Sequence, residues 1–319
     1  MAVQPALAQQ LSHTLKETRF TALGERYQGK VRDVYRRGDT LTLVTTDRLS
    51  AFDHVLTTIP FKGEVLNRLT NFWFEKTKHL VPNHTIAVPD PNVTVAKRCE
   101  PFAIEFVVRG YLTGSLWRDY QSGRHAAYGI PFEPGLKKDQ RFQRPMITPS
   151  TKAEYGKHDE AISEREILER GIMSRADWER ASEYALALFA EGQKWSNSRG
   201  LILVDTKYEF GKRDGEVLLI DEIHTPDSSR YWIASEYAAR FEAQQDQKML
   251  DKENIRQWLI RERGFSGQGQ PPPIPDEVRV DLAAKYLSAF EQITGAPLPL
   301  QVGDVNARIE RNMKAKGYL

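Results

Sequence analysis

The sequence predicts a protein that combines β-hairpins with amphipathic helices. Residues 25–48 and 201–221 alternate apolar and polar side chains on either side of a Gly-Asp or Asp-Gly pair, the pattern of a β-hairpin. Residues 64–80, 174–198 and 277–293 instead repeat apolar side chains at helical spacing. The chain has 319 residues, of which 40% are hydrophobic, so it is long enough for two domains with substantial cores.

Composition narrows the class of protein. The 45 basic and 43 acidic residues leave a net charge of +2, which gives no overall electrostatic preference for nucleic acid. Cys99 is the only cysteine, which excludes an intrachain disulfide and a cysteine-rich zinc site and favours a reducing compartment. No apolar run approaches the ~20 residues that span a bilayer, and the N-terminus has no signal-peptide pattern. We therefore expect a soluble cytoplasmic protein without a membrane or nucleic-acid partner; the sequence indicates no oligomeric state.

The first hairpin carries two basic residues beside a glycine. Gly29, Lys30 and Arg32 fall in its first strand, where a glycine allows a ligand to approach the backbone and residues two apart share a face. This arrangement would suit nucleotide phosphates, as the glycine-containing hairpin and lysine of kinases do, although neither a GxGxxG motif nor a P-loop is present. The alternative interpretation is a basic edge strand.

A polar loop and a helix follow the first hairpin. Ser50 and Asp53 supply a hydroxyl and an acid to the loop LSAFD. The helix predicted at residues 64–80 carries Trp73 on its apolar face and is ended by Pro82. We interpret the tryptophan as a core residue.

An apolar strand at residues 102–108 leads into a candidate anion site. Arg109 and Ser115 follow in the segment RGYLTGS, directly before a helical pattern. The N-terminus of a helix exposes N–H groups that bind anions, so this corner suits a phosphate. Ser115 can equally be only the N-cap of the helix. Residues 121–158 are rich in Gly, Pro and basic residues, and we expect them to be irregular.

Four further helical segments are predicted. Residues 159–170 come first, and the helix at 174–198 opens with the capping pattern of Ser174 to Asp177. Its apolar stripe, which includes Trp178, is interpreted as core. Residues 249–264 are amphipathic, and we expect the basic residues 306–319 to form a solvated helical tail.

The second hairpin brings acidic side chains to one face. Asp205, Lys207 and Glu209 alternate with neutral residues, so they project together. If the Asp-Gly turn is a three-residue loop with Gly215 left-handed, Glu209 lies directly opposite Asp221. Like charges that face each other across a hairpin are destabilising, so a cation is expected between them.

This oxygen-rich cluster predicts a Mg2+ site, because Mg2+ is usually held by one or two carboxylates while nucleotide phosphates complete its shell. The inference depends on the loop type. A two-residue turn would move Asp221 to the other face and put Glu222 in its place. The alternative is an exposed hairpin with solvated charges.

The loop after this hairpin, residues 221–230, contains acids, hydroxyls and one arginine. Ser228, Ser229 and Arg230 can donate to a phosphate or a carboxylate, and Asp227 can accept from a sugar hydroxyl or an amine. An ordinary Asx-type turn would explain Asp227 and Ser228 but not the arginine.

Together these motifs resemble one enzyme family. The segments GKVRDVY, LSAFD, EFVVRGYLTGS, LILVDTKYEFG and LLIDEIHTPDSSRYW occur in the order found in phosphoribosylaminoimidazole-succinocarboxamide (SAICAR) synthases of purine biosynthesis. The resemblance extends from about residue 24 to residue 295 and includes DKENIRQWL and KYLSAFEQITG.

The resemblance implies a magnesium-dependent ligase that uses ATP. In this family ATP activates the carboxylate of carboxyaminoimidazole ribotide (CAIR), and the amine of L-aspartate then displaces phosphate. Direct attack on a carboxylate would have to expel oxide, so prior phosphorylation supplies the leaving group.

By motif matching, the resemblance also implies roles for the ATP and metal residues. Lys30 would contact the ATP phosphates, and Lys207 would lie close to the nucleotide. Glu209 and Asp221 would hold Mg2+, with Glu209 also counted among the nucleotide-binding residues.

The ribotide site is implied in the same way. Arg109 and Ser115 would bind the ribotide phosphate with the help of Arg230, and Asp227 would face the ribotide. Lys30, Lys207 and Arg230 form the implied catalytic set. Ser50 and Asp53 belong to the matching substrate loop, which we assign to L-aspartate.

The implied fold consists of two α+β lobes with antiparallel sheets, similar to ATP-grasp and kinase architectures, with ATP between the lobes. We place the lobes at residues 1–100 and 101–319. The adenine would meet backbone near Arg98 and Glu100, because backbone N–H and C=O groups match its edge. Two alternatives are a small-molecule kinase of the same architecture, which would not need L-aspartate, and a nucleotide- or RNA-binding module, which has no use for facing carboxylates.

Overall fold

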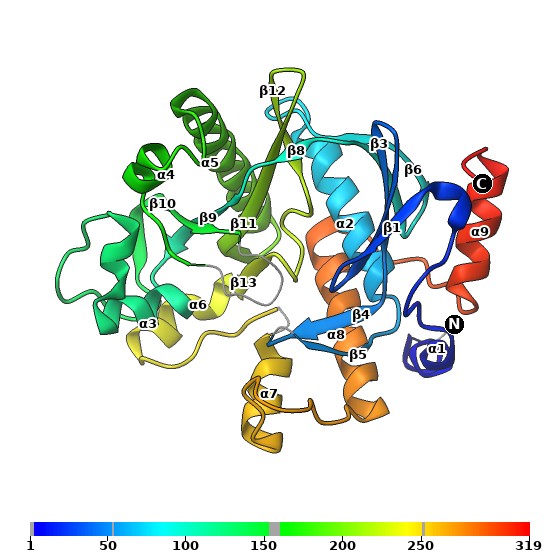
Figure 1. Cartoon of the computed structure of the whole chain (residues 1–319). Helices are drawn as coiled ribbons and strands as arrows, with labels where there is room; N and C mark the ends of the chain where they lie inside the picture. Colours follow the sequence, from blue (N-terminus) through cyan, green and yellow to red (C-terminus); the bar gives the residue numbers. More distant parts are fainter. Residues whose placement is uncertain (1–2, 53, 153–159, 251–252) are drawn as a thin grey trace. The chain divides into compact units, whose positions relative to one another are not determined.

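The computed structural model describes residues 3–52, 54–152, 160–250 and 253–319 (Figure 1). Packing contacts divide the chain into two units. The first comprises Met1–Trp73, His84–Arg98 and Asp251–Leu319, and the second Phe74–Asn83 and Cys99–Leu250. The sequence-based division after residue 100 differs from this one in the C-terminal segment, which packs with the first unit.

The first unit is built on a five-stranded antiparallel sheet in the order β1-β2-β3-β7-β6. A separate hairpin pairs β4 with β5. The strands of this unit are β1 (Glu25–Gln28), β2 (Arg32–Arg37), β3 (Thr40–Thr45), β4 (Arg48–Ala51), β5 (His54–Thr58), β6 (Thr85–Asp90) and β7 (Val93–Lys97).

The expected first strand is interrupted. A turn formed by Gly29, Lys30 and Val31 separates β1 from β2, and the Gly29 N–H donates to the Arg32 carbonyl at 2.8 Å to close it. The prediction that Gly29 and Lys30 lie in a strand is therefore wrong. Lys30 stands at the tip of a hairpin with its side chain exposed.

Helices cover the first unit, and the last of them is not a solvated tail. In α9 the side chains of Ile309 and Met313 are fully buried in a cluster with Tyr35 and Val44. The basic residues had suggested a solvated segment, but they lie on the other faces of an amphipathic helix. The helices of this unit are α1 (Val3–Gln10), α2 (Lys62–Thr77), α7 (Glu253–Arg263), α8 (Asp276–Thr294) and α9 (Val305–Ala315), with 3-10 turns η1 (Leu11–His13) and η2 (Thr21–Leu23).

The second unit contains a six-stranded antiparallel sheet. Strands run in the order β10-β9-β11-β12, and β13 and β8 also pair with β11, so β11 contacts four other strands. The α+β class with antiparallel sheets is confirmed. The strands are β8 (Glu100–Pro101), β9 (Ile104–Tyr111), β10 (Arg141–Thr151), β11 (Leu201–Arg213), β12 (Glu216–Ile220) and β13 (Ser229–Ile233).

Helix α5 packs on this sheet at β11 (Figure 1). Ser174 caps it by accepting from the Asp177 N–H, as its sequence pattern predicts, and Trp178 is buried against Phe106 with 5.1 Å between the ring centroids. The helix expected at residues 159–170 is shorter, and β10 occupies part of the region expected to be irregular. The helices are α3 (Gly114–Ser122), α4 (Glu164–Glu169), α5 (Arg175–Ser198) and α6 (Ala234–Glu242), with the 3-10 turn η3 (Arg124–Tyr128).

A buried histidine anchors the loop between β12 and β13. The Nε2 atom of His224 lies 2.6 Å from the Tyr208 hydroxyl, and the Tyr231 hydroxyl donates to the His224 carbonyl at 2.7 Å. Burial lowers the pKa of the His224 imidazole to about 3, so the ring is neutral at physiological pH. His224 has φ of +54°, a conformation that the surrounding contacts must hold.

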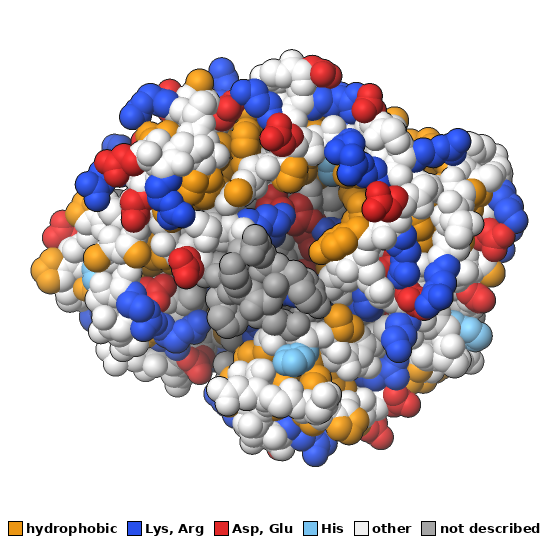
Figure 2. Space-filling model, viewed as in Figure 1, with side chains coloured by type: hydrophobic (Ala, Val, Ile, Leu, Met, Phe, Trp, Pro, Cys, Tyr) orange, Lys and Arg blue, Asp and Glu red, His pale blue; other side chains and the backbone are white. Residues whose placement is uncertain are grey.

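Charged side chains of both signs are interspersed over the face of the molecule in Figure 2, in keeping with the net charge of +2. In the part of the chain that the structure describes, no helix is both long and apolar enough to cross a membrane.

The neutral His224 makes stability depend on pH. Its folded pKa of about 3 lies below the 6.5 of an exposed imidazole, so only the unfolded chain takes up the proton between these values and stability falls as the pH falls. Between pH 7.5 and pH 5.5 this group removes about 1.4 kcal/mol from the free energy of unfolding. Urea unfolding of His224→Asn, which tolerates positive φ, should show a correspondingly weaker pH dependence. The exposed His79→Asn is the matched control, and an unchanged pH dependence in His224→Asn would contradict the assignment.

Candidate functional site

The β11–β12 hairpin has a two-residue turn. Arg213 pairs with Glu216, and Asp214 and Gly215 form the turn with φ of +51° and +83°. The three-residue loop predicted from the sequence is therefore wrong, and Glu209 lies opposite Ile220 instead of Asp221. An Asp-Gly pair tolerates two successive positive φ angles, which a two-residue hairpin turn requires.

Asp221 nevertheless reaches the cluster predicted for it. Strand β12 ends at Ile220, and Asp221 has φ of +64°, so its side chain no longer follows the strand alternation. Its Oδ2 lies 3.3 Å from the Lys207 Nζ. A two-residue turn was expected to put Glu222 in the place of Asp221. Glu222 is instead buried and accepts from the Thr225 hydroxyl at 2.6 Å.

Lys207 is the centre of a lysine–carboxylate cluster, which we define as Glu105, Lys152, Lys207, Glu209 and Asp221. The Lys207 Nζ donates to Glu105 Oε1 at 3.1 Å, to Asp221 and to Glu209. Lys152 donates to the second oxygen of Glu209. The two predicted metal ligands, Glu209 and Asp221, thus lie around one shared ammonium group.

Burial and the neighbouring carboxylates shift the pKa of Lys207 in opposite directions. Desolvation alone would lower the pKa of this side chain, but Glu209, Asp221 and Glu105 outweigh it and raise the pKa well above the usual value. The lysine is therefore charged. Among the described residues, no three His, Cys, Asp or Glu side chains are arranged as a ready metal site. In this arrangement the position that a cation would take is held by the ammonium group.

A second group of charged and polar side chains surrounds Asp205, which lies on the same strand as Lys207. We call this group the arginine corner and define it as Arg109, Ser115, Thr148, Asp205 and Arg230. Asp205 Oδ2 accepts from Arg109 Nη1 at 3.2 Å and from Arg230 Nη1 at 2.5 Å. Arg109 also donates to the hydroxyls of Thr148 and Ser115, at 2.8 and 3.1 Å. Burial lowers the pKa of the Arg109 guanidinium and Asp205 offsets part of that effect.

The structure decides the role of Ser115 within α3. The N-cap of the helix is Thr113, and Ser115 lies inside the first turn, so the N-cap interpretation of Ser115 is wrong. Gly114 has φ of +59°, and a Cβ there would lie 2.7 Å from the guanidinium nitrogens of Arg230. Glycine at this position allows the arginine to lie against the start of the helix.

The loop of residues 221–230 uses most of its hydroxyl groups internally. The Ser228 hydroxyl accepts from the Thr225 N–H at 3.1 Å, and the Ser229 hydroxyl lies 2.7 Å from that of Thr206. The Asp227 N–H donates to the Thr225 hydroxyl at 3.2 Å, and its side chain is half-buried. These bonds fix the backbone that leads to Arg230.

The remaining predicted site residues belong to other elements of the chain or lie outside the described residues. Lys30 is in the β1–β2 turn, and Ser50 is half-buried in β4 opposite Val55. Asp53 lies outside the described residues. The Arg98 N–H donates to the Asp39 carbonyl at 2.9 Å, and the exposed Glu100 lies in β8 opposite Lys212. A contact of this backbone with adenine stays a prediction.

Sequence reasoning assigned no site role to Glu105 or Lys152, and it placed Asp205 in the carboxylate cluster without pairing it with the arginines. Glu105 and Arg109 lie on one face of β9 because they are four residues apart in a strand, which is a signal that could have linked Glu105 to the site. Asp205 lies opposite Arg109 across the β9–β11 pair. Lys152 follows a strand that the sequence pattern did not predict, so nothing in its surroundings could have linked it to Glu209.

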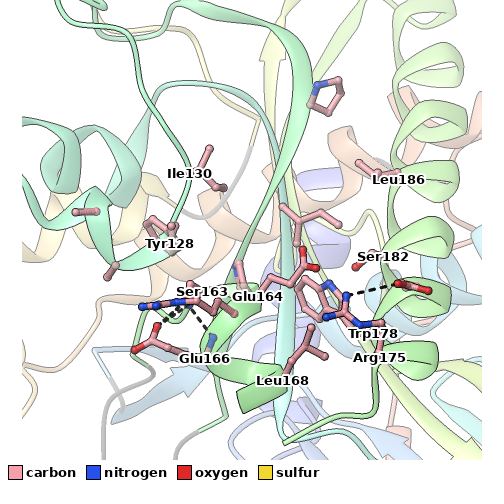
Figure 3. A pocket seen from close by; sticks show the side chains of 18 residues that line it. Tyr128, Ile130, Ser163, Glu164, Glu166, Leu168, Arg175, Trp178, Ser182 and Leu186 are labelled. Carbon is pink, nitrogen blue, oxygen red and sulfur yellow. Dashed lines mark hydrogen bonds and ion pairs between the residues drawn. The ribbon is translucent and has the colours of Figure 1, made fainter. Parts of the chain in front are cut away.

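The second unit also contains a cavity of about 1010 Å3 (Figure 3). It is lined by residues of η3, β10, α4 and α5, including Tyr128, Trp178 and Leu186. None of the predicted site residues lines it. Among its polar residues, Ser163 and Glu166 bond to each other in the capping box of α4.

The chain is similar over most of its length to proteins of known function. A family model described as SAICAR synthetase matches residues 25–272. The phosphoribosylaminoimidazole-succinocarboxamide synthase of Legionella pneumophila (strain Paris) is 48% identical over 298 residues, which cover 91% of this chain and 95% of that protein. The chloroplastic enzyme of Arabidopsis thaliana is 47% identical over 95% of this chain and 76% of its own length.

Solved structures agree with the sequence comparisons. The SAICAR synthase of Saccharomyces cerevisiae in complex with SAICAR has a TM-score of 0.78 and 30% identity, and the match covers 90% of this chain and 100% of the yeast chain. A type-2 SAICAR synthetase in complex with ADP has a TM-score of 0.65 at 24% identity, covering 86% of this chain and 99% of that chain. The second likeness supports the fold alone.

Without the Lys207 ammonium group, the three carboxylates around it should require another cation for stability. Without the ammonium group, Glu105, Glu209 and Asp221 repel one another, so Lys207→Met should lose about 1–3 kcal/mol of stability, less than for a fully buried pair. MgCl2 should raise the melting temperature of this variant more than that of the parent or than NaCl of equal ionic strength. Lys212→Met, which removes a lysine of the same strand that pairs with Asp177 at 2.8 Å, is the control. A melting temperature of Lys207→Met that does not respond to Mg2+ would contradict a cation site.

Proposed function

This chain belongs to the SAICAR synthetase family, and we propose that its reaction passes through an acyl phosphate and uses the two residue groups on β11. The chain catalyses the ATP-dependent formation of SAICAR in purine biosynthesis, as its family membership and its relatives of 45–48% identity establish. The yeast relative was solved with SAICAR itself. The assignment of roles to individual residues below is our proposal.

The charged side chains of the two groups carry the proposal. In the arginine corner two guanidinium groups converge on one carboxylate, Asp205. In the lysine–carboxylate cluster three carboxylates gather around two ammonium groups. Asp205 and Lys207 are two residues apart on one strand. An anion-binding group thus lies beside a cation-binding one, which suits a phosphorylated substrate and a metal-bound nucleotide.

The chemistry explains why ATP is required. An oxygen of the CAIR carboxylate attacks the γ-phosphorus, and ADP leaves with the bonding electron pair. The amine of L-aspartate then attacks the acyl carbon, a C–N bond forms, and phosphate departs with the former carboxylate oxygen while the amine loses a proton. Each step has a good leaving group, whereas direct amide formation would have to expel oxide.

In the second unit, the arginine corner is proposed to bind the ribotide phosphate. Arg230 is the more accessible of the two arginines, with 19% of its side chain exposed against 8% for Arg109. We therefore assign Arg230 to direct contact and Arg109 to both contact and orientation of Ser115. The half-buried Asp227 keeps its proposed place facing the ribotide.

The lysine–carboxylate cluster is proposed to serve the nucleotide. Glu209 and Asp221 would hold Mg2+, because their oxygens already surround one cation and match the donors that Mg2+ prefers. When bound, Mg2+ neutralises charge on the phosphates. Lys207 stays charged and orients both carboxylates, and it would stabilise negative charge on the transferring phosphoryl group.

The first unit contributes two further proposed sites. Lys30 in the β1–β2 turn would contact the ATP phosphates. Ser50, with Asp53, is assigned to L-aspartate. Cytoplasmic location stays a prediction from the single cysteine, Cys99.

ADP release tests the reaction. With ATP, Mg2+ and CAIR, sustained ADP release should require L-aspartate, because the acyl phosphate is consumed only by the amine. A small-molecule kinase of the same architecture would release ADP equally well without L-aspartate. When the CAIR carboxylate carries 18O, the label should appear in inorganic phosphate. Unlabelled phosphate would disprove the acyl-phosphate route while leaving the ligase activity intact.

The arginine corner should control the affinity for the ribotide. Arg230→Lys and Arg109→Lys keep the charge but lose the planar donor fork, so KM for CAIR should rise about tenfold or more while KM for ATP changes little. Steady-state kinetics with each substrate varied in turn would show this. Arg240→Lys, which alters a surface arginine paired with Glu236 in the same unit, should leave both constants unchanged. Equal increases in the two KM values would place the phosphate elsewhere.

A further inference from the structure

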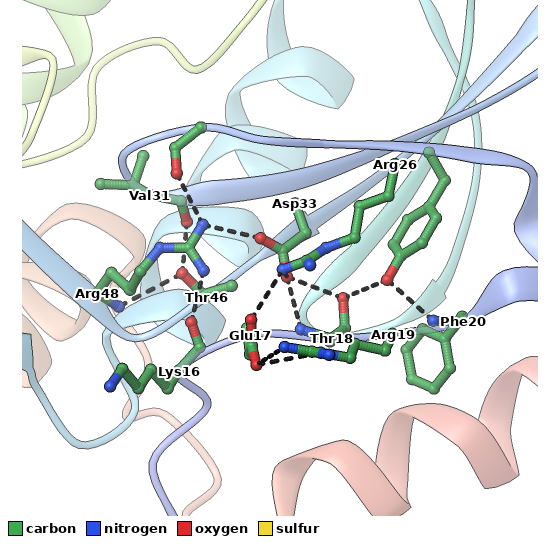
Figure 4. A network of polar contacts seen from close by, with 12 residues as sticks. Lys16, Glu17, Thr18, Arg19, Phe20, Arg26, Val31, Asp33, Thr46 and Arg48 are labelled. Atoms are coloured by element: carbon green, nitrogen blue, oxygen red, sulfur yellow. Dashed lines mark hydrogen bonds and ion pairs between the residues drawn. The ribbon is translucent and has the colours of Figure 1, made fainter.

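The β1–β2 turn is held from outside at the carbonyl oxygens of Gly29, Lys30 and Val31. Figure 4 shows Arg48, Thr46 and Asp33 in this network. The Arg48 guanidinium donates from Nη2 to the Gly29 carbonyl at 2.9 Å and from Nε to the Lys30 carbonyl at 3.1 Å. The Thr46 hydroxyl and N–H both donate to the Val31 carbonyl, at 2.7 and 3.0 Å. The closing bond of the hairpin itself involves none of these oxygens.

These contacts fix the direction of one side chain. The Gly29 and Lys30 carbonyls belong to the two planar peptide units on either side of the Lys30 Cα atom. A single rigid guanidinium group that binds both oxygens therefore sets φ and ψ of Lys30, and so the direction of its Cα–Cβ bond. The side chain itself is exposed.

The guanidinium is held in turn by a buried carboxylate and by the chain near the N-terminus. Arg48 is 2% exposed, and its Nη2 also donates to Asp33 Oδ1 at 2.9 Å. Its Nη1 donates to the Lys16 carbonyl at 2.5 Å. The other oxygen of Asp33 accepts from the N–H and the hydroxyl of Thr18, at 2.6 and 3.0 Å. Every nitrogen of the Arg48 guanidinium thus has a partner, and the segment 15–20 supplies part of the framework.

We infer that Arg48 is a positioning residue that orients Lys30 toward the transferring phosphate, and that the segment 15–20 supports it. The inference rests on the proposed phosphate contact of Lys30. The segment precedes residue 25, where the match to the family model begins, and the family assignment gives it no role. In this arrangement the N-terminal segment, through Lys16 and Thr18, is part of the phosphate-binding apparatus of the enzyme.

The substitution Arg48→Lys distinguishes the positioning role of Arg48 from a role that needs only its positive charge. Arg48→Lys keeps a cation beside Asp33 but cannot bind two carbonyls from one rigid plane. We expect kcat/KM for ATP to fall about tenfold to a hundredfold, as misplacement of a catalytic group does. KM for CAIR and for L-aspartate should change by less than about twofold, since these substrates do not depend on Lys30 in this mechanism. A purely structural role would instead lower the active fraction and leave every KM unchanged.

A double-mutant cycle with Lys30→Met tests whether Arg48 acts through Lys30. Once the ammonium group is absent, its orientation has no effect, so Arg48→Lys should cost less than about twofold in the Lys30→Met background. Hydrogen exchange of the peptide covering residues 25–35, measured without ligand, should be faster in Arg48→Lys because the turn has lost its external bonds.

Two further variants keep the test decisive. Arg308→Lys alters another buried arginine of the first unit, which binds Glu64 at 2.7 Å and does not touch the turn, and should leave the kinetics for ATP unchanged. If Arg48→Lys fails to fold, Thr46→Val provides a milder test. It removes the hydroxyl that donates to the Val31 carbonyl and accepts from the Arg48 N–H at 3.4 Å. This variant should lower kcat/KM for ATP about two- to fivefold, the effect of losing neutral hydrogen bonds.

The outcomes separate this inference from the proposed function. Suppose that Lys30→Met impairs the reaction and that Arg48→Lys lowers kcat/KM for ATP by the same factor in the parent and in the Lys30→Met variant. Arg48 then does not act through Lys30, and the inference alone is wrong. If Lys30→Met has parental kinetics, the phosphate contact of Lys30 is wrong, and the positioning role falls with it.

Discussion

The second unit depends on the pairing of charges along β11. This strand contacts four others, and charged groups in such a place are costly unless opposite charges surround them. Asp205, Lys207 and Glu209 alternate in sign, and each finds partners on neighbouring strands: the arginines for Asp205, carboxylates for Lys207 and two lysines for Glu209. The two arginines gather at one end of this short segment and the carboxylates at the other. The charge pairing of the strand therefore also separates the proposed ribotide group from the proposed metal group.

The buried polar residues around His224 give this charge pattern a fixed frame. The loop after β12 has to place Asp221 against Lys207 and Arg230 against Asp205, although only eight residues separate Asp221 from Arg230 in the sequence. Positive φ at Asp221 and His224 directs the chain, and the bonds of the imidazole and its carbonyl to two buried tyrosines hold it. A neutral imidazole suits this role because it forms a hydrogen bond without bringing another charge into the interior.

The first unit also holds a proposed site residue in place, but it does so through backbone carbonyl groups instead of paired charges. Its proposed catalytic lysine, Lys30, is exposed in the turn between β1 and β2. The framework acts on the backbone instead, since an arginine has enough donors to bind several carbonyls at once. In this arrangement the Lys30 backbone is fixed, while its exposed side chain can contact a phosphate group. A group that stabilises developing charge has to be held in place in this way.

The sequence by itself determined the α+β class, the family, and most helices and hairpins, because periodicity and motif order depend only on neighbours along the chain. Arg109, Ser115 and Arg230 were predicted to act together, and they lie together. Only the tertiary structure decided the partners of these residues. The register of the β11–β12 hairpin depended on one turn, and the tail at α9 proved to be core because its apolar face meets strands far away in the sequence. Lys152 and Arg48 carry no local signal, since their significance lies in carboxylates and carbonyl oxygens that only folding brings within hydrogen-bond distance.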